Sequence, residues 1–308
     1  MPFIVSDISY VDLNFCGTPK AIATGVYGGD AVVLVDPGPG SCVETLIGML
    51  KAQGIRVADI QSILVTHIHL DHAGATGRLV RENPKIRVFV HEKGAPHLID
   101  PSKLVNSANQ LWGVEGVARL WGEVVPVPSE NLHILGEHDR IAAAGHMFDV
   151  RYTPGHASHH VSYFDEGTGM VWAGDTAGLR FTSQTFTLPP TPPPDIDLEA
   201  WRESIGTLRA WGPETVFITH FGPYGNVTDH LDDLERSIAA AADIAKRAIA
   251  TDQSDDAKYE QFKRDVLAYI RASGVSESEI APLEHVGPLE FNWRGLVRYW
   301  KKRGVAAR

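Results

Sequence analysis

The chain has 308 residues, of which 44% are hydrophobic and 21% are charged, a balance typical of a soluble globular enzyme. Its formal net charge of −10 argues against a general affinity for nucleic acids. No apolar run approaches the roughly 18 residues of a membrane span, so no membrane anchor is expected. The first residues show no basic leader and no long apolar stretch, and two cysteines make no disulfide framework, so we expect a cytoplasmic protein without a secretory signal.

The first third of the chain predicts strands that alternate with helices, as in an α/β (α+β) fold. Gly28-Gly29-Asp30 is typical of a hairpin turn, and Ser41 is a candidate cap for the helix that follows it. Asp36 ends a strand abruptly, before two prolines and two glycines. The expected strands cover residues 13–16, 21–26, 31–35 and 60–65, and the expected helix covers residues 42–53.

The stretch Thr66-His67-Ile68-His69-Leu70-Asp71-His72 directly follows the predicted strand 60–65. His67 and His69 should point the same way, because side chains alternate in an extended segment, so one metal ion could take both. Asp71 and His72 lie beyond the turn and could reach a second ion. Imidazole and carboxylate groups suit zinc, iron or manganese, so four such groups in six positions predict a metal site.

The next 150 residues continue the alternation of strands and helices. The expected helices cover 74–82, 92–98 and 198–211, the last capped by Asp197, and the expected strands cover 86–90, 131–135, 138–142, 147–153, 160–165, 171–175 and 215–219. Residues 100–130 are interpreted as a short helical insertion over the pocket. Trp112 and Trp121 in it are interpreted as core or dimer contacts rather than substrate contacts. Five prolines within 189–194 predict a stiff crossing loop in 178–200.

The chain changes character after residue 226 and becomes helical and rich in alanine. Helices are expected at 227–251, 255–272, 276–284 and 292–303. The last of them is basic and could hold an anion or RNA. A solvated helix end, in which the basic residues favour the helix dipole, is the alternative that we prefer.

The ligand-rich stretch matches the HxHxDH signature of the metallo-β-lactamase-fold hydrolases, and with Thr66 it resembles the glyoxalase II branch. Further residues occur in the order of that family, namely Asp36, His156 in Thr153-Pro154-Gly155-His156, Asp175 in Ala173-Gly174-Asp175-Thr176, and His220 in Thr219-His220-Phe221-Gly222. The resemblance implies a four-layer αββα sandwich. It also implies a catalytic domain of residues 1–226 and a C-terminal helical appendage of residues 227–308.

The resemblance implies two divalent metal ions, with Zn²⁺ preferred and Fe or Mn as alternatives. The implied ligands are His67, His69 and His156 for the first ion and Asp71, His72 and His220 for the second, with Asp175 bridging both. Asp36 is implied to support the site from behind the ligands. His159 and His160 are candidate neighbours of the site. Asp71 and Tyr224 are the candidate catalytic residues. Tyr224 is either a hydrogen-bond donor to substrate or an aromatic residue at the pocket rim without a role.

A hydroxide held between two cations would be the nucleophile, because such cations lower the pKa of water to about 7. His69 replaces the Glu of the di-iron oxygen-reducing branch, and Asp175 replaces the Cys or Ser of true zinc β-lactamases. The favoured function is therefore hydrolysis of a small-molecule thioester or other carboxylic ester. The alternatives are a phosphodiesterase or RNase of the same fold, a mononuclear-iron sulfur dioxygenase, and a non-catalytic metal-binding module. The sequence leaves the oligomeric state undecided, and a homodimer is one possibility.

Overall fold

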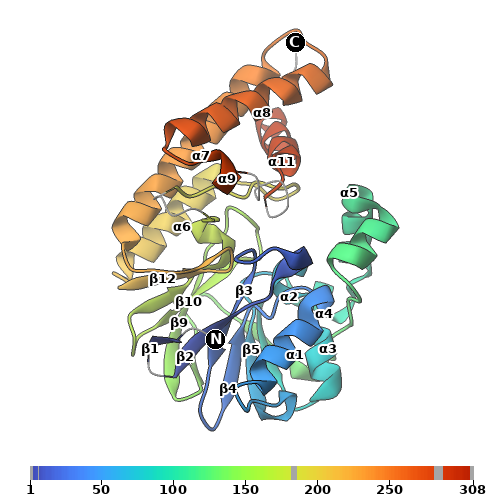
Figure 1. The fold of residues 1–308 in the computed structure, drawn as a ribbon, viewed down its shortest axis with the longest axis vertical. Helices are drawn as coiled ribbons and strands as arrows, with labels where there is room; N and C mark the ends of the chain where they lie inside the picture. Colours follow the sequence, from blue (N-terminus) through green and yellow to red (C-terminus); the bar gives the residue numbers. More distant parts are fainter. Residues whose placement is uncertain (1–2, 6, 182–185, 281–286, 306–308) are drawn as a thin grey trace.

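The structure is a computed structural model that describes residues 3–5, 7–181, 186–280 and 287–305. Two β-sheets lie face to face at its centre, and helices cover their outer sides (Figure 1). This arrangement confirms the predicted αββα sandwich. The C-terminal helices extend away from the sandwich above the second sheet (Figure 1).

The first sheet follows the order of the chain. Its described strands are β1 (Phe3–Val5), β2 (Ile8–Asp12), β3 (Ala23–Tyr27), β4 (Val32–Val35), β5 (Ile60–Leu64), β6 (Arg87–His91) and β7 (Leu132–Leu135). Strands β1 to β4 are antiparallel to one another in sequence order, whereas β4, β5, β6 and β7 run parallel. Because parallel strands end at the same edge, the segments after β4 and β5 meet there, which brings Asp36 beside Thr66.

The second sheet has the order β13-β12-β11-β10-β9-β8. Its described strands are β8 (Arg140–Ala143), β9 (His146–Tyr152), β10 (Val161–Asp165), β11 (Met170–Trp172), β12 (Thr215–Ile218) and β13 (Gly222–Tyr224). The pair β11 and β12 is parallel, so the segments that follow these two strands also reach one edge. Asp175 lies in a short 3₁₀ turn, η5 (Gly174–Ala177), after β11, and His220 follows shortly after β12.

Large apolar side chains from the inner faces of both sheets form the core of the sandwich. Tyr27 and Leu64 come from the first sheet, and Phe148, Tyr163 and Trp172 come from the second; all five are almost fully buried. The Tyr27 hydroxyl accepts a hydrogen bond of 2.7 Å from the indole N–H of Trp172, which ties the two sheets together. This core holds the ends of β5, β11 and β12 in fixed relative positions.

The helices outside the first sheet pack on its other face. They are α1 (Val43–Lys51), α2 (Leu70–Ala73), α3 (Thr76–Glu82), α4 (Ala95–Ile99) and α5 (Ser102–Leu120). Two sequence predictions were wrong here. Residues 13–16 form no strand, because Asn14 and Cys16 take left-handed backbone conformations beside the 3₁₀ turn η1 (Phe15–Gly17). Ser41 does not cap α1, because its hydroxyl donates to the Leu120 carbonyl instead.

The insertion at 100–130 is more regular than expected, because α5 occupies most of it and stands out from the sandwich (Figure 1). Gly113 takes a φ of +71° inside this helix and kinks it. The described residues of the proline-rich segment join neither sheet; Leu179 and Leu188, both within the segment, form an isolated antiparallel bridge with each other. Residues 182–185 of that predicted loop lie outside the described residues.

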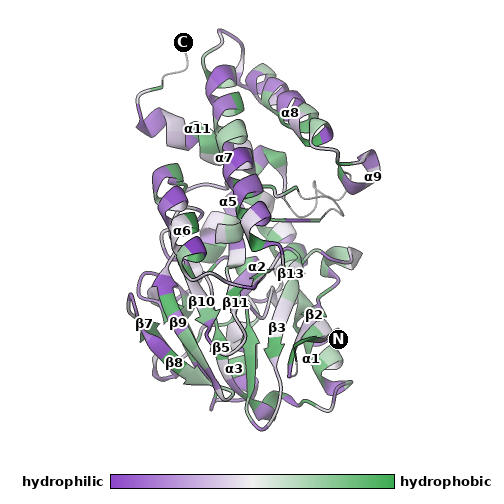
Figure 2. Cartoon of the chain, turned by 90° about the vertical axis from the view of Figure 1, so that its left-hand side faces the viewer, coloured by the Kyte–Doolittle hydropathy of each residue, from purple (hydrophilic) through white to green (hydrophobic). Residues whose placement is uncertain are grey.

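The helices outside the second sheet are α6 (Leu198–Ala210), α7 (Val227–Ile249), α8 (Asp255–Ala272), α9 (Glu277–Ile280) and α11 (Leu289–Lys302). Asp197 caps α6 as predicted, accepting from the N–H groups of Glu199 and Ala200. The predicted helix 276–284 is described only as far as Ile280, and its remainder lies outside the described residues. The hydropathy colouring shows polar and apolar faces on α7 and α8 (Figure 2).

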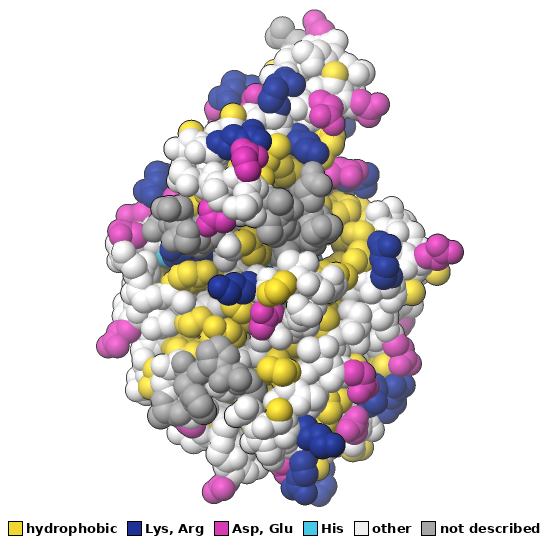
Figure 3. All heavy atoms as spheres, in the orientation of Figure 1, with side chains coloured by type: hydrophobic (Ala, Val, Ile, Leu, Met, Phe, Trp, Pro, Cys, Tyr) yellow, Lys and Arg dark blue, Asp and Glu magenta, His cyan; other side chains and the backbone are white. Residues whose placement is uncertain are grey.

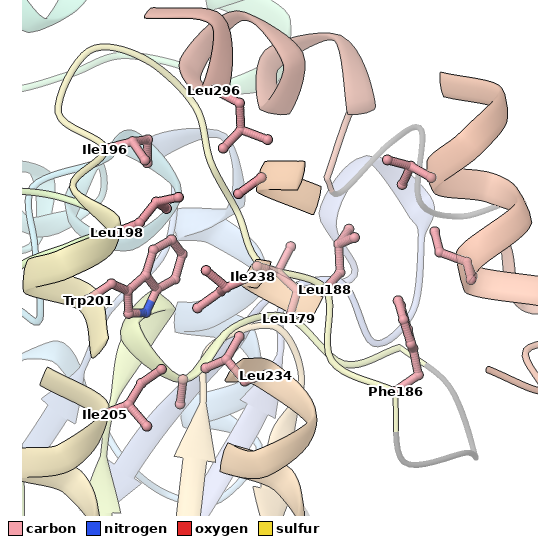
Figure 4. Packing of buried hydrophobic residues seen from close by; sticks show 14 of the residues in the cluster. Leu179, Phe186, Leu188, Ile196, Leu198, Trp201, Ile205, Leu234, Ile238 and Leu296 are labelled. Atoms are coloured by element: carbon pink, nitrogen blue, oxygen red, sulfur yellow. The ribbon is translucent and has the colours of Figure 1, made fainter. Parts of the chain in front are cut away.

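One apolar cluster joins the outer face of the second sheet to all the long C-terminal helices. Figure 4 shows this cluster, with Trp201 of α6, Leu234 and Ile238 of α7, and Leu296 of α11. The cluster runs across the predicted domain boundary at 226, and the division at that residue stays a prediction. Within the described part of the chain, none of the helices combines the length and the hydropathy that crossing a membrane would need.

Candidate metal centre

Segments that follow strands bring the predicted ligands to one place at the rim of the sandwich. The segment after β5 supplies His67 and His69, and it continues into α2, which carries Asp71 and His72. His156 follows β9, while Asp175 and His220 follow the parallel strands β11 and β12. The seven side chains predicted from the sequence therefore come together, although they span positions 67 to 220.

The first group consists of three imidazoles with converging nitrogens. His69 Nδ1 lies 2.9 Å from His67 Nε2 and 3.0 Å from His156 Nε2. Nitrogens around a tetrahedral zinc ion with bonds of about 2.0–2.1 Å lie roughly 3.4 Å apart, so these three need only a small adjustment to share a cation. Neutral imidazole is a good zinc, iron or manganese ligand, and the donor set fits such an ion.

Asp175 lies between this group and a second one. Its Oδ2 is 3.4 Å from His156 Nε2, whereas its Oδ1 is 3.2 Å from His72 Nε2 and 3.7 Å from His220 Nε2. Asp71 Oδ2 completes the second group, 3.3 Å from His220 Nε2. The two oxygens of Asp175 thus face two different sets of donors.

The back of each of three imidazoles is held by the protein, which fixes the nitrogen that points into the centre. His156 Nδ1 donates to the Pro190 carbonyl at 2.8 Å, and His220 Nδ1 donates to the Ala21 carbonyl at 2.8 Å. His72 Nδ1 donates to Asp36 Oδ2, also at 2.8 Å. Hydrogen bonds of this kind orient metal-binding histidines and set their tautomers.

Asp36 is a buried carboxylate that organises the base of the centre. Besides the hydrogen bond from His72, the Asp36 carboxylate accepts hydrogen bonds from the backbone N–H of Thr66 at 2.8 Å and from the Thr66 hydroxyl at 2.7 Å. The Thr219 hydroxyl, on the residue before His220, donates to it at 2.9 Å. Asp36 therefore connects the segments after β4, β5 and β12, as the family resemblance implied.

Burial and neighbouring charges divide the histidines into two kinds. Burial lowers the pKa of His67 and His69 well below the ordinary value, and it also lowers the pKa of His156, so these imidazoles are neutral and can donate a lone pair. Burial opposes protonation of His72 and His220 too. Nearby carboxylates, with Asp175 foremost, outweigh it and raise the pKa of both.

The carboxylates of the centre are held in the charged form. Burial alone would raise the pKa of Asp175, but His72, His220 and His156 together hold it well below its usual range. Burial would also raise the pKa of Asp71, but His72 and His220 outweigh it and lower that pKa to about 2. A cation that binds here replaces protons on His72 and His220, so its affinity should rise with pH.

His72 Nε2 and Asp175 Oδ1 are buried 3.2 Å from each other, and neither has any other hydrogen-bond partner among the described residues. Leaving such polar atoms unpaired is costly in a protein interior. Both atoms face the space between the carboxylates and imidazoles of the second group. A metal ion at this position accounts for them, so the residues fit the cofactor that the resemblance implied.

His159 and His160 lie beside the centre, and neither of them lines the cavity above it. The His160 ring stacks against His67 with centroids 4.9 Å apart, and its Nδ1 lies 3.0 Å from the Thr153 hydroxyl. His159 Nδ1 accepts from the backbone N–H of Ile68 at 3.5 Å. Both therefore support the first group from its sides.

A cavity of about 200 Å³ opens above the centre, and Figure 3 shows hydrophobic side chains around the hollow between α5 and the C-terminal helices. His69, Asp71, His156, Asp175 and His220 reach it directly. Its other lining residues, which the ligand motifs did not identify, include Trp112 and Trp121, Phe15, Leu111, Phe291, Asn292 and four prolines of the crossing loop. Trp112 and Trp121 thus pack against each other and also line the cavity.

Tyr224 is not brought to this cavity. Its hydroxyl donates to the Arg180 carbonyl at 3.1 Å, and its ring faces the Arg180 guanidinium and His230. The catalytic role of Tyr224 stays a prediction.

Comparisons with known proteins agree with this geometry. The profile of the Metallo-beta-lactamase superfamily matches residues 17–220. A hydroxyacylglutathione hydrolase from Chromohalobacter salexigens is 30% identical over 148 residues, which are 48% of this chain and only 43% of that enzyme. The chain thus spans less than half the length of this relative.

Solved structures give the same result. The metallo-beta-lactamase family protein TTHA1429 from Thermus thermophilus superimposes with a TM-score of 0.63 and 24% identity, over 82% of this chain and 89% of that one. TTHA1623, solved in a di-iron-bound form, superimposes with a TM-score of 0.51 and 26% identity, over 70% of this chain and 94% of that one.

Proposed function

The chain belongs to the metallo-beta-lactamase superfamily, and from this premise we propose that it is a hydrolase of thioesters or other carboxylic esters with two divalent metal ions. His67, His69 and His156 would hold the first ion, and Asp71, His72 and His220 the second. Asp175 would contribute one oxygen to each. Zn²⁺ is the preferred ion because imidazole and carboxylate ligands suit it, with Fe and Mn as alternatives.

The observation that carries this proposal is the position of Asp175. Its Oδ2 faces His156 of the first group, and its Oδ1 faces His72 Nε2 of the second at 3.2 Å, where neither of the last two atoms has another partner among the described residues. One ion in the first group would leave these two buried atoms with only each other. The di-iron form of TTHA1623 supports a count of two in a protein of the same fold.

When bound, the paired cations would supply an ionised water near neutral pH and polarise the carbonyl group of the ester. The protein's own residues set the conditions for this chemistry. Pro190, Ala21 and Asp36 fix the imidazole tautomers of His156, His220 and His72 through their Nδ1 atoms. The apolar wall of the cavity would shield the side of a bound ester that lies against it from bulk water.

Relatives support an ester as substrate class. Several proteins that share about 30% identity with part of this chain are named hydroxyacylglutathione hydrolases, and their names describe thioester hydrolysis. The chain spans under half of their lengths, so this activity is transferred here only as a proposal.

Elemental analysis combined with a substrate panel tests the proposal. We expect two equivalents of metal per chain, and hydrolysis of a thioester or a lactone in preference to a phosphodiester. The Asp175→Asn variant should lose metal and activity together. Normal metal content with full turnover in that variant would refute the shared role of Asp175. A metal-loaded chain that hydrolyses no member of the panel would favour a non-catalytic metal-binding module.

The second candidate is a phosphodiesterase, and one observation favours it. Arg294, Arg298, Lys301 and Lys302 of α11 line a shallow depression beside Pro193, a residue that also lines the cavity. If a nucleic acid binds there, its affinity should fall steeply as salt is raised. Absence of RNA binding at low salt would dismiss this candidate.

A further inference from the structure

The cavity above the metal centre has a polar floor and an apolar wall. The floor consists of the histidines and aspartates of the centre. The wall comes from segments far apart in the sequence, with Phe15 of η1, Leu104, Ala108 and Leu111 of α5, and Phe291 of α11 among its residues. A ligand in this space would therefore place a reacting group on the floor and an apolar group against the wall.

Aromatic contacts join the parts of the wall into one surface. The Trp112 ring lies 4.8 Å from Phe291 and 5.3 Å from Trp121, measured between centroids. Trp121 in turn stacks on Phe15 at 5.5 Å. This row of rings links α5 to α11, so the wall depends on both the insertion at 100–130 and the C-terminal helices.

The charge of the cavity limits which esters it can take. Among the described residues that line it, the only acidic or basic side chains apart from histidines are Asp71 and Asp175 of the centre, and no lysine or arginine is present. Glutathione carries two carboxylates, and with its thioester carbonyl on the metal centre these would meet no lysine or arginine among the described lining residues. Burying a charge without a partner is unfavourable, so the wall disfavours a glutathione thioester and favours an uncharged apolar group.

We propose that the substrate is an ester, thioester or lactone that carries an apolar group of several carbons, and that this group lies between α5 and α11. This inference rests on the proposed ester hydrolysis and names its substrate class. The apolar group belongs either to the acyl side or to the leaving group. Each methylene that becomes buried should raise kcat/KM, or the affinity for a product, about threefold to fourfold until the wall is filled.

Two substrate series test this proposal on the metal-loaded protein. The first varies the acyl chain of p-nitrophenyl esters from acetyl to decanoyl, and the second varies the alkyl group of acetate thioesters from ethyl to decyl. A rise of kcat/KM along one series supports the proposal and identifies the side of the ester that enters the wall. Values of kcat/KM that stay flat along both series, or that are highest for S-lactoylglutathione, would overturn it.

Binding gives a second measurement that does not depend on turnover. Dissociation constants of straight-chain carboxylic acids from butanoic to decanoic, measured by titration calorimetry, should fall with chain length. If no ester is hydrolysed but this dependence is found, the proposed hydrolase function fails while the apolar binding site stands. If esters are hydrolysed but neither the affinity nor kcat/KM depends on chain length, the proposed hydrolase function is supported and the proposed apolar substrate class is wrong.

Variants of α5 locate the effect. Ala108 is buried in the wall, so Ala108→Phe should lower the ratio of decanoyl to acetyl turnover by at least about tenfold. Ala118→Phe is the matched control, because Ala118 is exposed on the same helix and does not line the cavity. If Ala108→Phe does not fold, Leu111→Gln tests the same wall, because it replaces an apolar lining side chain with a polar one. An unchanged ratio in a folded wall variant would contradict the assignment.

Discussion

Asn292 Oδ1 on α11 accepts a hydrogen bond of 2.8 Å from the backbone N–H of Thr191. The Thr191 hydroxyl also donates to the Asn292 carbonyl at 3.2 Å. Thr191 follows Pro190, whose carbonyl fixes the Nδ1 of His156. A C-terminal helix thus holds the proline-rich loop that orients a predicted metal ligand.

The Asn292→Ala variant should therefore weaken metal binding although Asn292 is no ligand. Losing the direct hydrogen-bond partner of a ligand typically costs about 10-fold to 100-fold in metal affinity. Asn292 acts one step further away, through Thr191, so we expect a loss near the lower end of that range, and the unpaired Thr191 N–H should cost about 1–3 kcal/mol of unfolding free energy. Competition with a chelator and urea unfolding measure the two effects. Glu290→Ala, on the exposed surface of the same helix, is the control. Equal metal affinity in both variants would contradict the coupling.

Asp36→Asn tests the base of the centre. An amide has one acceptor oxygen, so at least one of the donors from Thr66, Thr219 and His72 would lose its partner. We expect about a 10-fold to 100-fold loss of metal affinity, because His72 loses the carboxylate that sets its tautomer. The readout is metal content after dialysis against graded chelator. Asp30→Asn, at an exposed hairpin turn, should retain full metal content.

The sequence predicted the position of the centre well because its signals are local. Each ligand follows a strand or lies in a short polar stretch, and parallel strands such as β11 and β12 must end at one edge. The pattern of apolar residues identified those strands and most of the helices around them. The family motifs then limited the choice among fourteen histidines to five.

The cavity wall could not be predicted in the same way, because its contacts are between distant residues. Nothing in the sequence near Trp112 indicates that its ring meets Phe291, and the apolar residues of α5 follow no single face. Phe15 was assigned to a strand, and only the left-handed backbone of its neighbours turns it toward Trp121. The role of Asn292 likewise depends on a hydrogen bond to a residue about a hundred positions away.

His230 should make the protein less stable in mild acid. It is fully buried on α7, its Nε2 donates to the Ala177 carbonyl, and burial lowers its pKa to about 4. The unfolded chain, with a pKa near 6.5, binds more protons between these values, so stability is intact above about pH 6.5 and falls as the pH drops toward 4. From about pH 7 to about pH 5 the expected loss is roughly 2 kcal/mol.

Urea unfolding of the wild type and of His230→Gln at both pH values measures this contribution. The other histidines titrate in both proteins, so the difference between the two isolates His230. The glutamine variant should lose less stability on acidification than the wild type. The same pH dependence in both proteins would show that His230 takes no part in acid unfolding.

Gly174 should be intolerant of any side chain because the backbone passes close to the centre there. It has a φ of +45°, and a Cβ atom would lie 2.5 Å from the Thr66 hydroxyl oxygen and 2.7 Å from His160 Nε2. Gly174→Ala should therefore cost at least about 2 kcal/mol of unfolding free energy and shift the adjacent Asp175. Gly206→Ala is the matched control, since Gly206 lies within α6 with open space around its Cβ position. That change should instead stabilise the protein by about 0.5–1 kcal/mol, because alanine favours a helix more than glycine does. Thermal unfolding of both variants, with and without added Zn²⁺, measures the expected loss of stability in Gly174→Ala and the expected gain in Gly206→Ala. A Gly174→Ala protein that melts like the wild type and retains its metal would contradict the close packing beside Asp175.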